Sequence, residues 1–204
     1  MFLIFREVSP KILMTLIFLT CVLLFALGTQ AIETLPMETQ QTILNLNVVL
    51  AIGFIITHLV AKLKWLMPAF LLGLCFTSGA IVAVLAGSYQ LVVVSMGIAV
   101  LVSLLAYLLA LAPWLQVGKR TLIVSLMAFA FSFFGIWWME TYPDISAGAS
   151  LLAMLCLSGL LREAFHPIRT GTPTENPLDR AAGLFLLNAG MIINTIVILN
   201  VFSL

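Results

Sequence analysis

Residues 69 to 87 read AFLLGLCFTSGAIVAVLAG, a stretch without a single charged side chain. A helix of about 20 such residues is long enough to cross the hydrocarbon core of a bilayer. The apolar residues are continuous and do not alternate with polar ones, so a helix is predicted and not a strand of a membrane barrel. The stretch therefore predicts a transmembrane helix.

The whole chain has the same apolar character. Of its 204 residues, 63% are hydrophobic and only 8% are charged. A water-soluble domain of this composition would expose large apolar patches, so the expected surroundings are a lipid bilayer. The net charge is +1 and the chain has no run of basic residues, so nucleic acid is not an expected partner.

Short connections with turn chemistry divide the chain into seven apolar segments. The segments cover about 12–31, 43–61, 65–86, 91–111, 121–138, 145–161 and 181–204. They predict an all-α, polytopic membrane bundle of about seven helices, a single domain over 1–204, with a cytoplasmic loop at 162–180. One alternative is that the first segment is a cleaved signal peptide, because basic residues precede it and GTQA (28–31) follows it; six helices would then remain.

The positions of the basic residues predict an orientation. With seven helices, all nine Lys and Arg fall on one side of the membrane, whereas the opposite connections hold only acidic charges. The positive-inside rule then places the N-terminus in the cytoplasm and the C-terminus outside, in the inner membrane of a bacterium. The nine residues are Arg6, Lys11, Lys62, Lys64, Lys119, Arg120, Arg162, Arg169 and Arg180.

The longest polar stretch, REAFHPIRTGTPTENPLDR (162–180), has a structural explanation for much of its length. Arg162 is expected at the C-terminal end of the sixth helix, and Pro167 is expected to end that helix. Asn176 is the expected N-cap of the seventh helix, with Pro177 in its first position and Asp179 in its first turn.

Glu163, His166 and Arg169 remain as candidate functional residues at the cytoplasmic surface. His58, near the inner end of the second helix, is either a site residue or an interfacial histidine. Together with Lys62 and Lys64, these groups are of the type that binds a phosphate-bearing headgroup.

Neutral polar residues inside the second and seventh helices are the candidates for a solute pathway. The same residue types also hold helices together in lipid, so both interpretations stay open. Asn194 is expected in a packing contact beside Gly190, whereas Asn188 and Thr195 lie on another face that better suits a pathway. The candidates are Asn45, Asn47, Asn188, Asn194 and Thr195.

Small residues at a spacing of four predict close helix crossings, either inside the bundle or with partner subunits or a second copy of the chain. They form three series: Ala69, Gly73 and Thr77; Gly79, Ala83 and Gly87; Ala149 and Ala153. The three cysteines, Cys21, Cys75 and Cys156, are interpreted as buried small apolar residues, so no metal site and no cofactor is predicted.

Three hypotheses of function follow. The first is a membrane protein that mediates transport of a neutral or amphipathic solute through the helix bundle. The second is a non-catalytic subunit or assembly factor of a larger inner-membrane complex. The third is an enzyme acting on lipid headgroups; it is the weakest because no motif supplies a nucleophile with an acid and a base.

Overall fold

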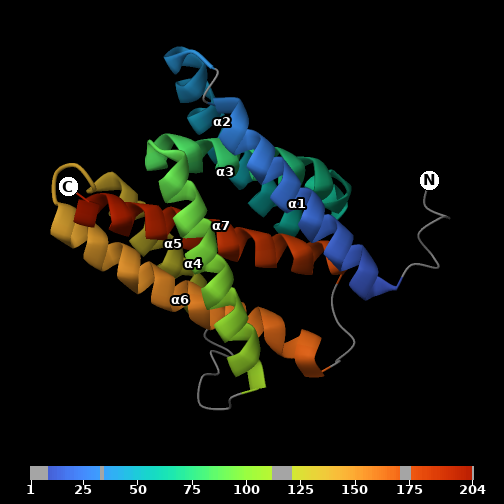
Figure 1. Ribbon diagram of the computed structural model, residues 1–204. Helices are drawn as coiled ribbons and strands as arrows, with labels where there is room; N and C mark the ends of the chain where they lie inside the picture. Colours follow the sequence, from blue (N-terminus) through green and yellow to red (C-terminus); the bar gives the residue numbers. More distant parts are fainter. Residues whose placement is uncertain (1–8, 33–34, 112–120, 171–175, 204) are drawn as a thin grey trace. The chain divides into compact units, whose positions relative to one another are not determined.

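The computed structural model describes residues 9–32, 35–111, 121–170 and 176–203. Within these ranges the chain is helical throughout and has no strand, which confirms the all-α prediction (Figure 1). The helices are α1 (Pro10–Ile32), α2 (Met37–Leu59), η2 (Ala61–Leu66), α3 (Met67–Ala86), α4 (Tyr89–Leu108), η3 (Leu109–Leu111), α5 (Thr121–Trp137), α6 (Pro143–Thr170) and α7 (Pro177–Ser203).

Six of these helices are long and apolar enough to cross a membrane: α1, α2, α3 with η2, α4, α6 and α7. Helix α5 has 17 residues and measures about 26 Å, near the lower limit for a span. The count of seven spans and their orientation therefore remain predictions. Arg6, Lys119 and Arg120, on which the orientation partly depends, lie outside the described residues, as does the side chain of Lys11.

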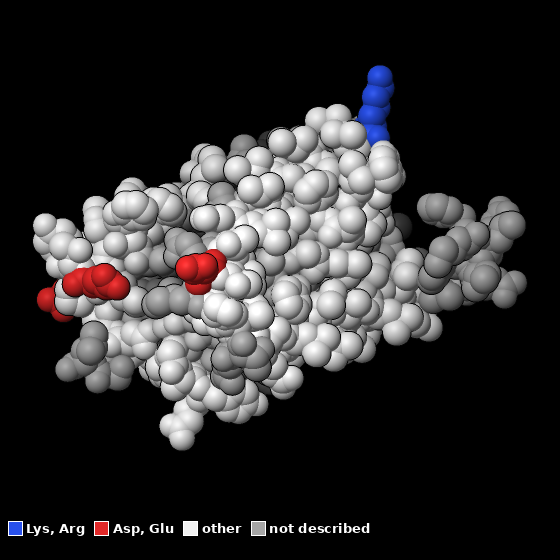
Figure 2. Space-filling view, turned by 90° about the horizontal axis from the view of Figure 1, so that it is seen from above, with Lys and Arg blue, Asp and Glu red and all other residues white. Residues whose placement is uncertain are grey.

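The surface of the helices is that of a lipid-facing protein. On α1, Leu16, Leu19, Leu23 and Leu27 are exposed along one face, while Phe25 on another face is buried. A helix that is apolar all round suits a membrane span better than the surface of a soluble domain. The face shown in Figure 2 carries only a few charged side chains.

The chain divides into two compact units, and helices α3 and α7 contribute residues to both. The first unit comprises Met1–Ile81 and Glu175–Phe185. In it, α1 packs against α3 so closely that a side chain at Gly28 or Gly79 would meet the backbone of the other helix. The Phe25 and Phe185 rings meet edge to face, with their centroids 6.0 Å apart. These glycines place a close crossing inside the unit, one of the two alternatives left open by the small-residue series.

The second unit comprises Val82–Thr174 and Leu186–Leu204. Here α5 packs along α6, and α4 and η3 also contact α6. Gly190 of α7 faces Leu157 of α6, leaving no room for a larger side chain without movement of that leucine. Helix α6 is thus the helix against which the other helices of this unit pack.

Two helices begin with a side-chain cap, and the one at Asn176 was predicted from the sequence. The Ser88 side chain accepts a hydrogen bond from Leu91 N–H at 3.3 Å, and Asn176 Oδ1 accepts one from Leu178 N–H at 3.1 Å. Gly87, the residue before Ser88, has φ 61°, a left-handed conformation that favours glycine. Gly87 therefore serves a turn and not the small-residue face to which it was assigned.

The predicted end of the sixth helix is wrong. Helix α6 continues through Pro167 to Thr170, so the 162–180 stretch is helical over its first nine residues and is not a loop there. Proline removes one backbone hydrogen bond, but its φ is compatible with a helix. Two contacts offset that loss: Thr170 Oγ1 donates to the His166 carbonyl at 3.0 Å, and Arg169 is anchored to the end of α4.

Candidate functional site

The polar residues of α2 belong to the first unit. Asn47 Nδ2 donates to Thr77 Oγ1 at 2.7 Å and to Ser78 Oγ at 3.2 Å, which joins α2 to α3. Asn45 is exposed on the outer surface of α2, away from this contact. The backbone of His58 lies in α2, but its side chain lies outside the described residues.

In the second unit, the polar groups of α7 face neighbouring helices. Asn188 Oδ1 accepts a hydrogen bond from Ser103 Oγ of α4 at 2.6 Å, and Asn200 Nδ2 donates to the Leu85 carbonyl at 2.8 Å. Thr195 is almost fully buried and its hydroxyl donates to the Met191 carbonyl at 2.8 Å. Helix α7 is therefore held by amides and hydroxyls along much of its length.

Asn194 has no exposed surface and connects α7 to α5. Its Nδ2 donates to Ser132 Oγ and to the Gly190 carbonyl, both at 2.8 Å. The orientation of the amide follows from these partners: the carbonyl can only accept, and the Ser132 hydroxyl already donates to the Ala128 carbonyl. Asn194 therefore presents its N–H groups to α5 and to its own helix.

Asn194 belongs to a polar strip between α5, α6 and α7, which we call the serine–asparagine seam: Ser132, Gly135, Ser146, Ser150 and Asn194. Ser132 and Gly135 lie one turn apart on α5, and Ser146 and Ser150 lie one turn apart on α6. The Ser146 hydroxyl donates to the Gly135 carbonyl, and a Cβ at Gly135 would collide with Ser150 Oγ. The missing side chain at Gly135 thus lets α6 approach α5 along the seam.

The seam has hydrogen-bonding groups that its described neighbours do not use. Ser150 Oγ and Asn194 Oδ1 are fully buried and have no hydrogen-bond partner among the described residues. A buried polar atom in this state costs about 1–3 kcal/mol. Buried polar atoms without a partner are rare in folded proteins, so these two oxygens require an explanation.

The sequence prediction included Asn194 but missed Ser132, Ser146 and Ser150. A signal was present, because Ser146 and Ser150 repeat at the spacing that places two hydroxyls on one face of a helix. On this helix the sequence prediction used only the spacing of Ala149 and Ala153, as small-residue packing. Gly135, the residue that brings Ser150 to α5, carries no signal in the sequence by itself.

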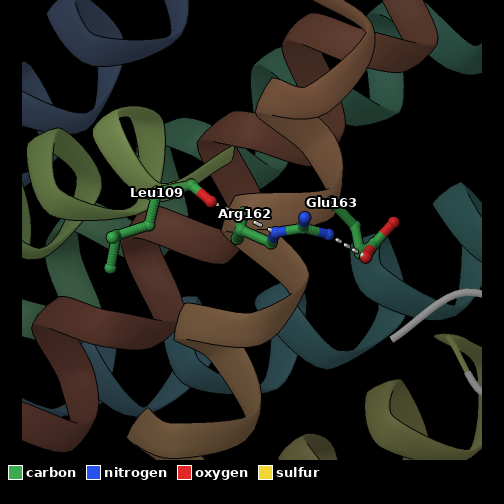
Figure 3. Close-up of polar contacts among 3 residues, drawn as sticks. All are labelled: Leu109, Arg162 and Glu163. Carbon is green, nitrogen blue, oxygen red and sulfur yellow. Dashed lines mark hydrogen bonds and ion pairs between the residues drawn. The ribbon is translucent and has the colours of Figure 1, made fainter. Parts of the chain in front are cut away.

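The polar end of α6 is a second candidate region. Arg162 is only 2% exposed and lies in the interior of α6, not at its terminus as predicted. Figure 3 shows its guanidinium between two oxygens: Nε donates to the Leu109 carbonyl at 3.4 Å, and Nη1 pairs with Glu163 Oε1 at 2.6 Å. Arg162 lies about 29 Å along α6 from Pro143, a distance close to the thickness of a hydrocarbon core.

Arg169 repeats this arrangement near the C-terminal end of α6. Its Nη1 donates to the carbonyls of Tyr107 and Leu108 at 3.0 and 2.7 Å, and its guanidinium lies 5.2 Å from the Tyr107 ring centre. Both arginines therefore bind carbonyls at the C-terminal end of α4 and in η3, where the helix dipole is negative. His166, which lies between the two arginines in the sequence, is half-buried.

No known family model and no curated protein sequence matches the chain. The class therefore comes from the helices alone. Their length and apolar composition indicate a membrane protein with transmembrane helices.

Proposed function

We propose that this chain is an integral membrane protein that moves a small neutral or amphipathic solute through its helices, by way of the serine–asparagine seam. The observation that supports the proposal is the pair of buried, unpartnered oxygens, Ser150 Oγ and Asn194 Oδ1. An amide oxygen accepts a hydrogen bond, and a serine hydroxyl can donate or accept one. A solute with hydroxyl or amide groups could exchange its bonds to water for bonds to these atoms.

The chemistry of the seam favours a solute without charge. Its five residues are all neutral, and an ion in an apolar interior requires a compensating charge. The adjoining residues of α6 include Met154 and Leu157, which favour apolar parts of a solute. A molecule with a few hydrogen-bonding groups on a small carbon frame fits both requirements.

A permeability measurement tests this function. Proteoliposomes containing the wild-type chain should admit glycerol or urea faster than liposomes without protein, as followed by light scattering after rapid mixing. Asn194→Leu removes the open oxygen and adds bulk, so it should slow this entry. Leu155→Ala, on the exposed face of α6, is the matched control and should leave the rate unchanged. Wild-type rates equal to those of empty liposomes for both probes would refute transport of solutes of this class.

A second function is favoured by a different observation. Asn47, Asn188 and Asn200 each bond to another helix, so most described amides act as interhelical contacts. A protein built in this way suits the role of a non-catalytic subunit or assembly factor, with partner membrane subunits or a second copy at its apolar faces. Extraction of the native membrane in mild detergent distinguishes the two: a stoichiometric partner supports the subunit, and an isolated chain with permeability supports transport.

The headgroup enzyme remains the least supported of the three. Its cations in the last third of α6, Arg162 and Arg169, bind backbone carbonyls and Glu163. These contacts indicate that the two arginines anchor the C-terminal end of α4. They leave His166 as the group whose substitution would distinguish a reaction from an anchor.

A further inference from the structure

A strip of aromatic side chains runs along the exposed face of α5. Phe129, Phe133 and Trp137 recur at a spacing of four, which places them on one face of the helix. Their exposed fractions are 72%, 50% and 70%, and the Phe133 and Trp137 rings stack with their centroids 5.7 Å apart. The strip is therefore open to a molecule that lies along α5, and it ends where the chain turns into α6.

At that turn two further rings stand at a right angle, in a group that we call the aromatic corner: Trp138, Glu140 and Tyr142. The Tyr142 N–H donates to the Trp138 carbonyl at 2.8 Å, closing a turn that brings the two rings together. Their centroids are 6.4 Å apart and their planes meet at 88°. Phe134 stacks on Trp138 with the centroids 5.0 Å apart and so holds the orientation of that ring. The corner thus has two aromatic walls.

The corner also carries a carboxylate without a structural partner. Glu140 lies in the turn between the two rings, is exposed, and has no hydrogen bond or ion pair with any described residue. The neighbouring Asp144 has a structural explanation, because a carboxylate in the first turn of α6 complements the helix dipole. Aromatic rings beside an unpaired carboxylate attract an alkylated ammonium ion, through the ring faces and through charge.

The position of the corner relates it to the membrane. It immediately precedes Pro143, where α6 begins, and α6 is long and apolar enough to cross a bilayer. Trp and Tyr are enriched at this level of a membrane, where phospholipid headgroups lie. An ammonium headgroup at the corner would leave its acyl chains beside the exposed rings of α5. A phospholipid matches both the corner and the strip, whereas a free cation matches the corner alone.

We propose that the aromatic corner binds the ammonium headgroup of a zwitterionic phospholipid, with an acyl chain lying along the aromatic strip of α5. The ammonium group lies against the Trp138 and Tyr142 rings and beside the Glu140 carboxylate. An anionic headgroup such as that of phosphatidylglycerol lacks the cation and is repelled by Glu140, so the site distinguishes the two kinds of lipid. The proposal does not depend on the transport function.

Native mass spectrometry of the delipidated chain in detergent micelles tests the site, with dioleoyl phosphatidylcholine and dioleoyl phosphatidylglycerol as the probes. The acyl chains are identical, so a preference reports the headgroup. We expect the first phosphatidylcholine to bind about fivefold more tightly, the factor that an exposed cation–π contact provides. Glu140→Gln and Trp138→Leu should each lower the affinity for phosphatidylcholine by about two- to fivefold and narrow the preference.

Matched controls separate the headgroup from the strip. Phe129→Leu changes the strip about 13 Å along the helix from Trp138, so it should affect both lipids equally. Glu38→Gln removes an exposed carboxylate at the start of α2, in the other unit, and should affect neither. All four variants should keep the helix content of the wild type, because none of the changed side chains is buried.

Competition distinguishes a lipid headgroup from general adhesion to the strip. Tetramethylammonium ions should displace phosphatidylcholine but not phosphatidylglycerol, because they compete only for the aromatic corner. Equal affinity of the wild-type chain for the two lipids, or an undiminished preference in Glu140→Gln or Trp138→Leu, would overturn the proposal.

Discussion

At the scale of single residues, Arg162 shows how a membrane helix accommodates a charge. Its guanidinium is buried, yet Glu163 and the Leu109 carbonyl provide partners on opposite sides. A buried charge is tolerated only with such compensation. The contact also ties the Leu109 carbonyl, where α4 ends and η3 begins, to α6, so one residue satisfies a helix end and fixes a neighbouring helix.

Replacement of Arg162 should therefore destabilise the second unit. Arg162→Met keeps the apolar stem but removes the donors, and the loss should be about 1.5–3 kcal/mol, the range for hydrogen bonds to charged groups. Arg162→Lys keeps the charge but cannot reproduce the fork of donors, so it should restore only part of the loss. Unfolding in detergent with increasing denaturant measures both. An unchanged midpoint for Arg162→Met would show that the contact contributes nothing to stability.

Replacement of Asn176 should also lower the stability of the protein, but by a smaller amount. Its side chain caps α7, so Asn176→Ala should lower the free energy of unfolding by about 1 kcal/mol. Ser125→Ala is a suitable control, because the Ser125 hydroxyl is exposed and bonds within its own helix. If the two variants unfold at the same denaturant concentration, the cap is not a source of stability.

At the scale of helices, the α1–α3 crossing depends on two positions that must lack a side chain. Gly28→Ala and Gly79→Ala would each place a Cβ against backbone of the other helix, and overpacking of this kind costs about 1–3 kcal/mol. Gly97→Ala and Gly148→Ala are matched controls, since a Cβ there meets open space. Alanine is the better helix former, so the controls should be neutral or slightly stabilising. Thermal unfolding of the four variants in detergent gives the comparison, and equal effects at all four would contradict the crossing.

The helices also show which features are readable from local sequence. Asn176 acts as a cap through a bond to a residue two positions away, so its role was predicted correctly. The continuation of α6 past Pro167 was not predicted, because it depends on contacts of Arg169 with residues more than sixty positions earlier. The meeting of Ser150 with Gly135 is likewise set by the register between helices. Periodicity within one helix carries no information on that register.

At the scale of the whole molecule, orientation in the membrane is still a prediction. A cysteine that replaces Glu140 should react in intact cells with a thiol reagent that does not cross membranes, whereas one that replaces Lys64 should not. Both positions are exposed, so access to the reagent depends on the side of the membrane. Labelling at both positions, or at Lys64 alone, would contradict the orientation deduced from the basic residues.

The central claim is that the serine–asparagine seam admits a hydrogen-bonding solute from water. It is tested most directly by the reactivity of a cysteine that replaces Ser150, in a chain whose native cysteines are changed to alanine. If the seam opens to water, Ser150→Cys should react with a small, water-soluble thiol reagent in membranes, while Leu155→Cys on the exposed apolar face of the same helix should not. Complete protection of Ser150→Cys, with normal labelling of Glu140→Cys, would contradict the account and leave the seam as a packing contact.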